Sequence, residues 1–230
     1  MKTHLFAAAA ALLVVTLAPI PAQAQSKDEA GEAKRLRDSI TVFSEVMAAE
    51  DKAIPTKILE RAEAIAIFPS TIKGGFIVGG LRGRGVLSAR TPAGWSSPAF
   101  LTLTGGSIGL QIGGQAVDII LVIMNRRGLE NLVANQFKIA ADVAVAAGPV
   151  GRNAEASTDL QLRAQILSYS RARGLFAGVT ISGSTIRQDT DANERFYGMP
   201  LSNRDIVLGA KAGAPEPVPA WLAALGSAKR

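Results

Sequence analysis

The stretch KGGFIVGGLRGRGVL, at residues 73–87, decides the class of fold. Each glycine in a helix costs about 1 kcal/mol relative to alanine, so this stretch does not predict a helix. Strands accept glycine where they bulge, bend sharply or approach another backbone closely. Twelve of the 23 glycines of the chain fall between Gly74 and Gly114. The region is therefore predicted to form strongly curved strands.

Short apolar segments on both sides of this stretch extend the strand prediction. Repeated β-α-β units are not visible, so the strands are expected to pair in an antiparallel sheet. The predicted fold class is α+β, with an antiparallel, strongly curved Gly-rich β-sheet (a sandwich or partly closed barrel) and with N-terminal and flanking helices. Strands are expected at 64–68, 73–87, 100–104, 107–112, 117–124, 138–147, 165–170, 175–181 and 185–187.

A long helix is predicted before the sheet. Ser26 and Glu29 fit a capping box at its start. Apolar residues then recur at helical spacing, which indicates one apolar stripe that packs on the domain; a partner or a membrane surface is the alternative. Pro55 disfavours helical geometry in the residue before it and can itself begin a second, short helix. The stripe consists of Ala33, Leu36, Ile40, Phe43 and Met47.

The two ends of the chain differ from this central part. Residues 1–24 are typical of a secretory signal peptide, with Lys2, an apolar run at 5–17 and small residues at Ala22 and Ala24. A periplasmic or secreted protein is therefore expected. The predicted organisation is a signal peptide at 1–24, a helical segment at 25–62, a β-rich domain at 63–212 and a Pro-rich tail at 213–230, of which the apolar turn 221–225 docks back on the domain.

The composition argues against catalysis. The 230 residues include no cysteine, and the one histidine is His4, inside the predicted signal peptide. The commonest general base at neutral pH and every thiolate nucleophile are then absent from the mature chain. Residues 105–109, GGSIG, match the G-x-S-x-G pattern of hydrolases, but Ser107 has no histidine base and is flanked by predicted strands on both sides. No enzyme, no catalytic residue and no cofactor are predicted.

Three aspartates next to apolar or small residues are candidates for a metal site. Asp118, Asp142 and Asp159 offer carboxylates that would suit Ca²⁺ or Mg²⁺. They are far apart in the sequence, so we expect turn capping or pairing with arginine, and no metal.

Basic residues give the strongest functional signal. The chain has a formal net charge of +6, which favours anionic partners. Arg82 and Arg84 are two residues apart and would share one face of a strand, as would Arg171 and Arg173. Guanidinium groups beside glycine amides are suited to bind phosphate oxygens. The simpler alternative is that these arginines lie on a sheet face that is exposed to solvent and binds nothing. The predicted lipid-binding residues are Lys73, Arg82, Arg84, Arg171, Arg173, Phe76 and Trp95.

A series of motifs in order makes the chain resemble the SYLF domain family. The resemblance runs from about Ile40 to Gly198. The motifs are IAIFP at 65–69, KGGF at 73–76, GWSSPAF at 94–100, GGSIGLQIGGQAVD at 105–118, AAGPVGR at 146–152 and YSRARGLFAG at 169–178.

This resemblance implies a membrane-lipid-binding module rather than an enzyme. The function expected is a non-catalytic periplasmic phospholipid-binding protein whose partner is an anionic membrane surface. The alternative is a structural or stress-linked envelope protein that binds another protein or peptidoglycan. Nucleic acid is not expected as a partner, because export would separate the chain from nucleic acid and few aromatic side chains are present to stack on bases. Family members of the yeast actin-patch type bind actin, but actin binding is not expected for an exported chain.

Overall fold

The structure is a computed structural model of the whole chain, and it describes residues 23–49, 54–75, 78–108, 115–139, 142, 144–150, 164–172, 175–178, 181 and 183–228. The predicted signal peptide therefore lies outside the described residues, apart from its last two. The described helices are α1 (Gln23–Met47), α2 (Thr56–Arg61), α3 (Arg126–Leu132), α5 (Thr190–Tyr197), α6 (Asn203–Val207) and α7 (Val218–Ser227). The described strands are β1 (Ala64–Gly75), β2 (Val78–Thr91), β3 (Gly94–Trp95), β4 (Ala99–Ile108), β5 (Gln115–Ile123), β6 (Gln136–Lys138), β7 (Val145–Ala147), β8 (Ile166–Ala172), β9 (Leu175–Gly178) and β10 (Ser184–Gln188).

The strands form one curled sheet, which confirms the predicted α+β class. Its order is β6-β10-β4-β2-β1-β5-β8-β7, with β3 paired to β2 and β9 paired to β8. The prediction of a purely antiparallel sheet is wrong at one edge, because β7 pairs with β8 in parallel. Parallel neighbours need a crossover of about a dozen residues or more, and the segment between Ala147 and Ile166 is long enough. Of the strand predicted at 138–147, the described residues include only the last residue of β6 and the whole of β7 as strand.

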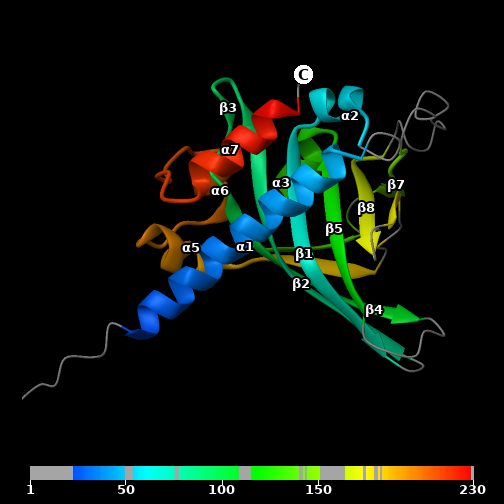
Figure 1. Cartoon of the computed structure of the whole chain (residues 1–230), viewed down its shortest axis with the longest axis horizontal. Coiled ribbons are helices and arrows are strands. Elements are labelled where there is room, and N and C mark those ends of the chain that lie inside the picture. Colours follow the sequence, from blue (N-terminus) through cyan, green and yellow to red (C-terminus); the bar gives the residue numbers. More distant parts are fainter. Residues whose placement is uncertain are drawn as a thin grey trace, which may run out of the picture.

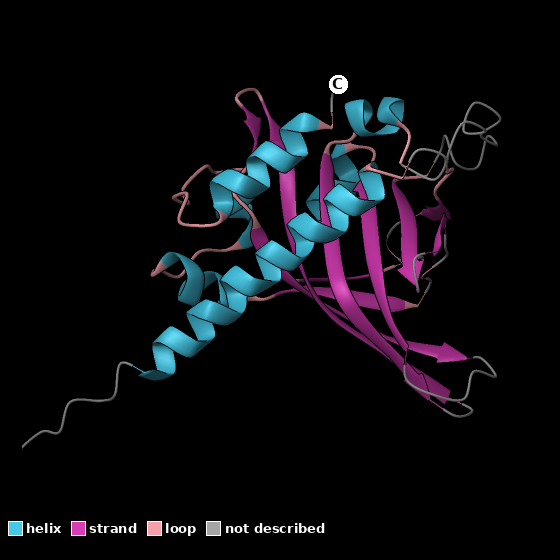
Figure 2. Ribbon diagram, in the orientation of Figure 1, coloured by secondary structure: helices cyan, strands magenta, loops and turns pink. Residues whose placement is uncertain are grey.

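Each face of the sheet carries a buried apolar cluster. Residues of the distant strands β6 and β8, such as Phe137 and Ile166, meet in one apolar cluster, so this side is the inner face of the curl. Helices α3 and α6 pack against it through Leu129 and Ile206. The other side, here called the helix face, is covered by α1, α2, α5 and α7. Figure 2 shows these helices lying across one side of the strands.

Helix α1 crosses the sheet diagonally (Figure 1). The predicted apolar stripe is confirmed: Leu36 and Phe43 are fully buried, and the other members are partly buried against the same cluster. The helix begins at Gln23, three residues before the predicted cap at Ser26, so Ser26 lies within the helix. Pro55 precedes α2 as predicted. The apolar stripe therefore packs on the domain itself.

Glycine allows the strands to pack closely on the inner face. A Cβ at Gly85 would lie 2.4 Å from the carbonyl oxygen of Ile67 and 2.5 Å from the ring of Phe68. A Cβ at Gly83 would lie 2.4 Å from Oγ1 of Thr71. Both contacts are too short for any side chain, so the curl of β2 over β1 requires glycine at these positions.

The C-terminal part closes the helix face. The Trp221 side chain of α7 is fully buried, and its indole Nε1 donates a hydrogen bond to Ser88 Oγ at 2.8 Å. This confirms that the apolar turn at 221–225 docks back on the domain, as part of a helix. Helices α5 and α6 were not predicted from the sequence.

Candidate functional site

Arg82 and Arg84 lie side by side on the helix face of β2. The pairing of β2 with β4 is continuous from Val78 to Leu87, so the side chains of β2 alternate between the two faces without a break. Val86 belongs to the cluster under α1, and Arg84 and Arg82 are two and four residues before it. Figure 1 shows β1 and β2 running on past α1, and both arginines are exposed. The prediction that they share one face is confirmed.

The strand order brings two more cations to the same face. Arg84 pairs with Thr102 of β4, and Thr102 pairs with Arg187 of β10. Two residues further along the strands, a second line of paired residues crosses the sheet. Arg82 pairs with Thr104 of β4, Thr104 pairs with Thr185 of β10, and Thr185 pairs with Lys138 of β6. Directly paired residues of neighbouring strands point to the same side of a sheet. We call the resulting surface the basic face: Arg82, Arg84, Thr102, Thr104, Thr185, Arg187, Gln136 and Lys138.

No acidic side chain belongs to the basic face. Its four cations are exposed, and within the described part of the chain none of their side chains forms an ion pair. Asp142, near its edge, accepts a hydrogen bond at 2.6 Å from the backbone N–H of Lys138. The face therefore presents four positive charges and three threonine hydroxyls to solvent.

A buried ion network lies at the end of β10, next to the basic face. Arg35 of α1 lies within 2.6 Å of Glu32 and within 3.0 Å of Asp189, and its guanidinium lies 5.1 Å from the centre of the Phe100 ring. Arg195 of α5 approaches Glu32 at 2.8 Å. Asp189 follows Arg187 by two residues, yet its carboxylate is committed to Arg35. The nearest carboxylate along β10 thus does not neutralise the arginine.

Arg171 occupies a structural position rather than a free one. Its Nε donates to Asp118 Oδ2 at 2.8 Å, and its Nη1 pairs with Glu45 of α1. Burial lowers the pKa of Arg171, but hydrogen bonds to Glu45 and Asp118 outweigh burial and hold the pKa above its ordinary value. Arg171 was predicted to contact lipid; in the structure it joins α1 to β5 and β8. Asp118 also accepts a hydrogen bond from the backbone of Ser70, so it pairs and caps as expected.

The remaining predicted residues are not gathered at the basic face. Lys73 pairs with Leu81, which packs against the inner cluster, so Lys73 lies on the opposite side of the sheet from Arg82. Trp95 is half-buried on β3, opposite Arg90, about 26 Å along β2 from Arg82 at ~3.3 Å per residue. Phe76 and Arg173 lie outside the described residues.

Arg90 has a structural role next to Trp95. Its guanidinium lies 4.3 Å from the centre of the Trp95 ring and donates hydrogen bonds to the carbonyl oxygens of Leu59 and Ala62 at 2.7 and 3.1 Å. Burial lowers the pKa of Arg90, while Glu63 and Glu60 raise it. Arg90 therefore caps the C-terminal end of α2, and Trp95 is packed under it rather than presented to a ligand.

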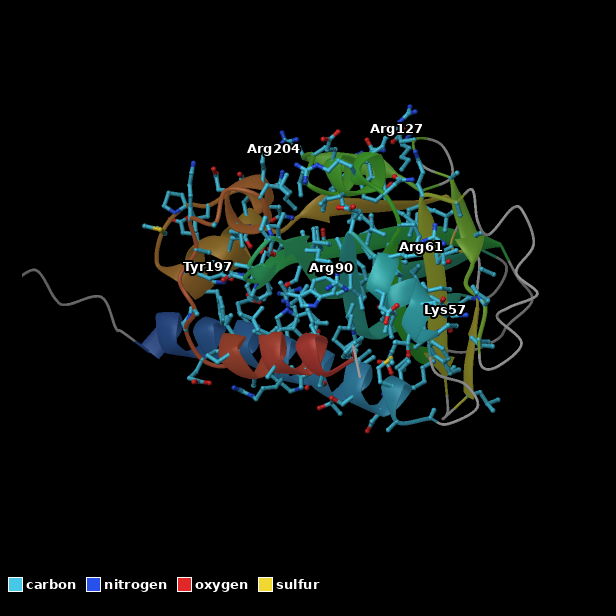
Figure 3. All side chains as sticks on the ribbon, turned by 90° about the horizontal axis from the view of Figure 1, so that it is seen from above. Lys57, Arg61, Arg90, Arg127, Tyr197 and Arg204 are labelled. Carbon is cyan, nitrogen blue, oxygen red and sulfur yellow. The ribbon has the colours of Figure 1, made fainter. Side chains whose placement is uncertain are left out.

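Other exposed basic residues lie elsewhere. Figure 3 shows Arg127 and Arg204 projecting on the side of the molecule away from α1 and α7, and Lys57 and Arg61 on α2. These pairs are set apart from the two rows of the basic face. They provide charge-matched controls for it.

The described residues hold no group of three or more His, Cys, Asp and Glu side chains that could bind a metal ion. Asp159 lies outside them. Ser107 lies within β4, not at a turn from a strand into a helix, so its backbone differs from a nucleophile elbow. Among the described helices, none has the length and apolar character needed to cross a membrane.

Lys138 and Arg187 were missed as site residues. The alternation of Thr185, Ile186 and Arg187 places the arginine on the polar side of a strand, and that signal is present in the sequence. Their position on the same face as Arg82 and Arg84 is not, because β10 pairs with both β4 and β6 across more than 40 intervening residues.

Comparison with known proteins places this curled sheet in a family. The sequence model of the Ysc84 family, described as "Las17-binding protein actin regulator", matches residues 104–228. Human SH3 domain-containing YSC84-like protein 1 is 33% identical over 195 residues, which are 83% of this chain and 55% of that protein. Protein YSC84 of Saccharomyces cerevisiae is 32% identical over 195 residues, 83% of this chain and 41% of that protein.

The Xenopus laevis SH3 domain-containing YSC84-like protein 1 is similar to the same degree, with 32% identity over 182 residues, 78% of this chain and 53% of that protein. The chain belongs to the Ysc84 family, also known by its SYLF domain. It spans about half the length of the curated relatives it matches.

Proposed function

We propose that this chain is an exported envelope protein that associates with anionic phospholipid surfaces through its basic face, without catalysis. The observation that carries the proposal is the uncompensated charge of Arg82, Arg84, Arg187 and Lys138 on one exposed side of a sheet. A basic residue near an anionic membrane surface contributes about 1 kcal/mol. Four such residues are enough for reversible attachment.

The apolar contribution would come from the same row of the sheet. Ile72 pairs with Arg82 and is 62% exposed, so an isoleucine lies directly beside the basic face. Attraction of the cations to headgroups would place this side chain at the depth of the interface, where apolar burial adds to binding.

Co-sedimentation with liposomes tests the proposal. Vesicles of phosphatidylcholine with phosphatidylglycerol should bind the chain, and vesicles of phosphatidylcholine alone should not. Arg82→Glu with Arg84→Glu should weaken partitioning by at least ~2 kcal/mol, or roughly 30-fold, and the loss should shrink as salt rises. The control is Arg127→Glu with Arg204→Glu, which makes the same change of net charge on the other side. Equal binding to neutral and anionic vesicles would refute the electrostatic account.

Export rests on residues 1–24 and has its own test. Cell fractionation should find the protein in the envelope, and its intact mass should correspond to a start near Gln25. A protein that keeps Met1 would contradict a cleaved signal peptide.

A protein partner is the second candidate function. The family description and the name of one yeast relative, "LAS seventeen-binding protein 3", refer to binding a protein. An acidic partner could use the same four cations. Saturable capture of an envelope protein or peptidoglycan, lost in Arg82→Glu with Arg84→Glu while liposomes are ignored, would favour this candidate. Actin co-sedimentation should be negative for an exported chain.

A further inference from the structure

Strand β9 lies at an outer edge of the sheet. It pairs with β8 and, among the described strands, with no other. Figure 1 shows β8 at one margin of the molecule. An edge strand presents N–H and C=O groups that can pair with a strand of another chain, so proteins usually protect their edges with charged side chains, bulges or covering segments. The state of each edge of this sheet therefore indicates where a further strand can dock.

The hydrogen bonds of β8 show which of its residues face this edge. The N–H of Ile166 donates to the carbonyl oxygen of Ala144, and the carbonyl oxygen of Ser168 accepts from the N–H of Gly148. Both bonds run toward β7. Backbone groups alternate between the two sides of a strand, so the even-numbered residues of β8 direct theirs toward β7 and β9.

The same alternation orients the backbone of β9. Ser170 is even-numbered and pairs with Ala177, so the N–H and C=O groups of Ala177 point toward β8. The neighbours of Ala177, Phe176 and Gly178, then direct their N–H and C=O groups away from β8. Within the described part of the chain, no backbone hydrogen bond uses these outward groups. Strand β9 therefore has an open edge.

The edge at β6 is closed. Lys138 directs its backbone groups outward, because the next residue, Ile139, donates toward β10 to the carbonyl of Ser184. Asp142 occupies both groups: its carboxylate accepts from the Lys138 N–H at 2.6 Å, and its own N–H donates to the Lys138 carbonyl at 3.0 Å. Strand β9 lacks such protection. Its four residues, LFAG, carry no charge, and Leu175 is 65% exposed.

Two copies of β9 fit each other in antiparallel orientation. A two-fold axis at Ala177 brings Phe176 of each copy opposite Gly178 of the other. Each of these two pairs can exchange two hydrogen bonds through the outward groups. Ala177 then faces its own copy in a non-hydrogen-bonded pair, where Cα atoms are only about 4.5 Å apart, so a small side chain suits this position. Leu175 lies on the same face as Ala177, two residues from the axis.

We propose that a second copy of this chain docks on β9, in antiparallel register about Ala177, and extends the sheet across a homodimer. An uncharged, self-complementary edge fits an identical strand, whereas an acidic partner would be attracted to the basic face instead. A two-fold interface uses the same strand of both chains, so association through β9 stops at two copies. The contact involves one short strand and is therefore weak and reversible.

A single cysteine tests the register, because the chain has none of its own. Mild oxidation should convert Ala177→Cys into a disulfide-linked dimer, since a Cα separation of about 4.5 Å is within the range of a disulfide. The matched control is Ala223→Cys, on the exposed side of α7, which should stay largely monomeric at the same concentration. Equal cross-linking of the two variants would show random collision and overturn the proposal.

Sedimentation velocity tests association without a cross-link. The unmodified chain should form a dimer as its concentration rises, and more readily at high salt, because screening weakens the repulsion between two chains of net charge +6. Ala177→Glu places two carboxylates opposite each other and should raise the dissociation constant of the dimer roughly tenfold or more. Ala223→Glu makes the same change of net charge and should bind its copy like the unmodified chain.

Each remaining outcome decides against the proposal. A chain that stays monomeric at every concentration and salt would overturn the dimer. A dimer that Ala177→Glu leaves intact would overturn its assignment to β9. Liposome binding is measured separately, so membrane association stands or falls without regard to these results.

Discussion

Removal of the Arg35 guanidinium should undock helix α1. The side chain is 6% exposed, and it neutralises two carboxylates, Glu32 at 4% and Asp189 at 14% exposure. In Arg35→Met, Asp189 loses its ion-pair partner, and Glu32 keeps only Arg195. A buried ion pair that loses one member typically costs about 3–5 kcal/mol, because the other charge stays buried without compensation.

The expected loss can be placed within that range. Asp189 still accepts a hydrogen bond from the backbone of Ala192, which favours the low end. The contact between the Arg35 guanidinium and the Phe100 ring is lost as well, and such contacts contribute about 0.5–2 kcal/mol. We therefore expect a loss of about 3–5 kcal/mol in the free energy of unfolding. For a chain of this size, that corresponds to a melting temperature lower by roughly 6–20 °C.

Denaturant unfolding followed by circular dichroism measures the loss, and hydrogen exchange locates it in α1. Arg37→Met is the matched control, because Arg37 is exposed on the same helix and should change stability by less than about 0.5 kcal/mol. Adding Asp189→Asn to Arg35→Met should restore part of the stability, since asparagine keeps the helix cap of α5 without the charge. A loss below ~1 kcal/mol for Arg35→Met, or no recovery in the double variant, would refute the argument.

Three further predictions follow from the packing and the ionisation of single groups. Gly85→Ala should lower the free energy of unfolding by about 1–3 kcal/mol, measured by urea denaturation, because its Cβ would clash with Ile67 and Phe68. Gly80→Ala is the control and should leave stability unchanged, since nothing lies within 4 Å of its Cβ position. Equal effects of the two substitutions would contradict the close-packing argument. Burial raises the pKa of both tyrosines, Tyr169 and Tyr197, above the ordinary value of 10.0, so the free energy of unfolding should fall as the pH rises past that value. Tyrosinate absorbance should therefore appear only when the chain unfolds at alkaline pH. Tyrosinate absorbance from a chain that is still folded would show that these side chains are not buried. Hydrogen bonds from Lys211 and then Ser202 lower the pKa of Asp205 from 3.8 to about 2, so its contribution to stability should be present above pH ~4 and disappear toward pH ~2. Melting curves of Asp205→Asn should lack this component, and an unchanged acid profile would show that Asp205 does not contribute.

Local chemistry accounts for what the sequence predicted correctly. The glycine density of residues 73–87 excludes a helix whatever the surroundings, and the stripe from Ala33 to Met47 has the period of a helix packed on one side. Arg82 and Arg84 share a face because strand geometry has a period of two residues. Each of these inferences depends on neighbours in the sequence, and each is found in the structure.

Contacts between distant segments account for what was missed. The sequence predicts that Asp118 pairs with an arginine but does not identify Arg171 as that arginine, because nothing local indicates that β5 pairs with β8. The short helices α5 and α6 have capping signals at Asp189 and Ser202, but a few residues of helix depend on the packing around them rather than on propensity. The parallel edge at β7 likewise depends on a crossover that the local pattern does not specify.

The sequence R-G-R-G at residues 82–85 links the curl of the sheet to its charge. Because strand side chains alternate, glycine at Gly83 and Gly85 necessarily leaves Arg82 and Arg84 on the other side. The glycines permit the inner face to close on Phe68 and Thr71, and this closure lets β4 and β10 continue the curl past β2. That continuation carries Arg187 and Lys138 to the same side as the two arginines. If the basic face binds anionic membranes as proposed, replacing Gly83 or Gly85 with a larger residue should weaken liposome binding as well as stability, because the positions of the four cations depend on how tightly the strands curl.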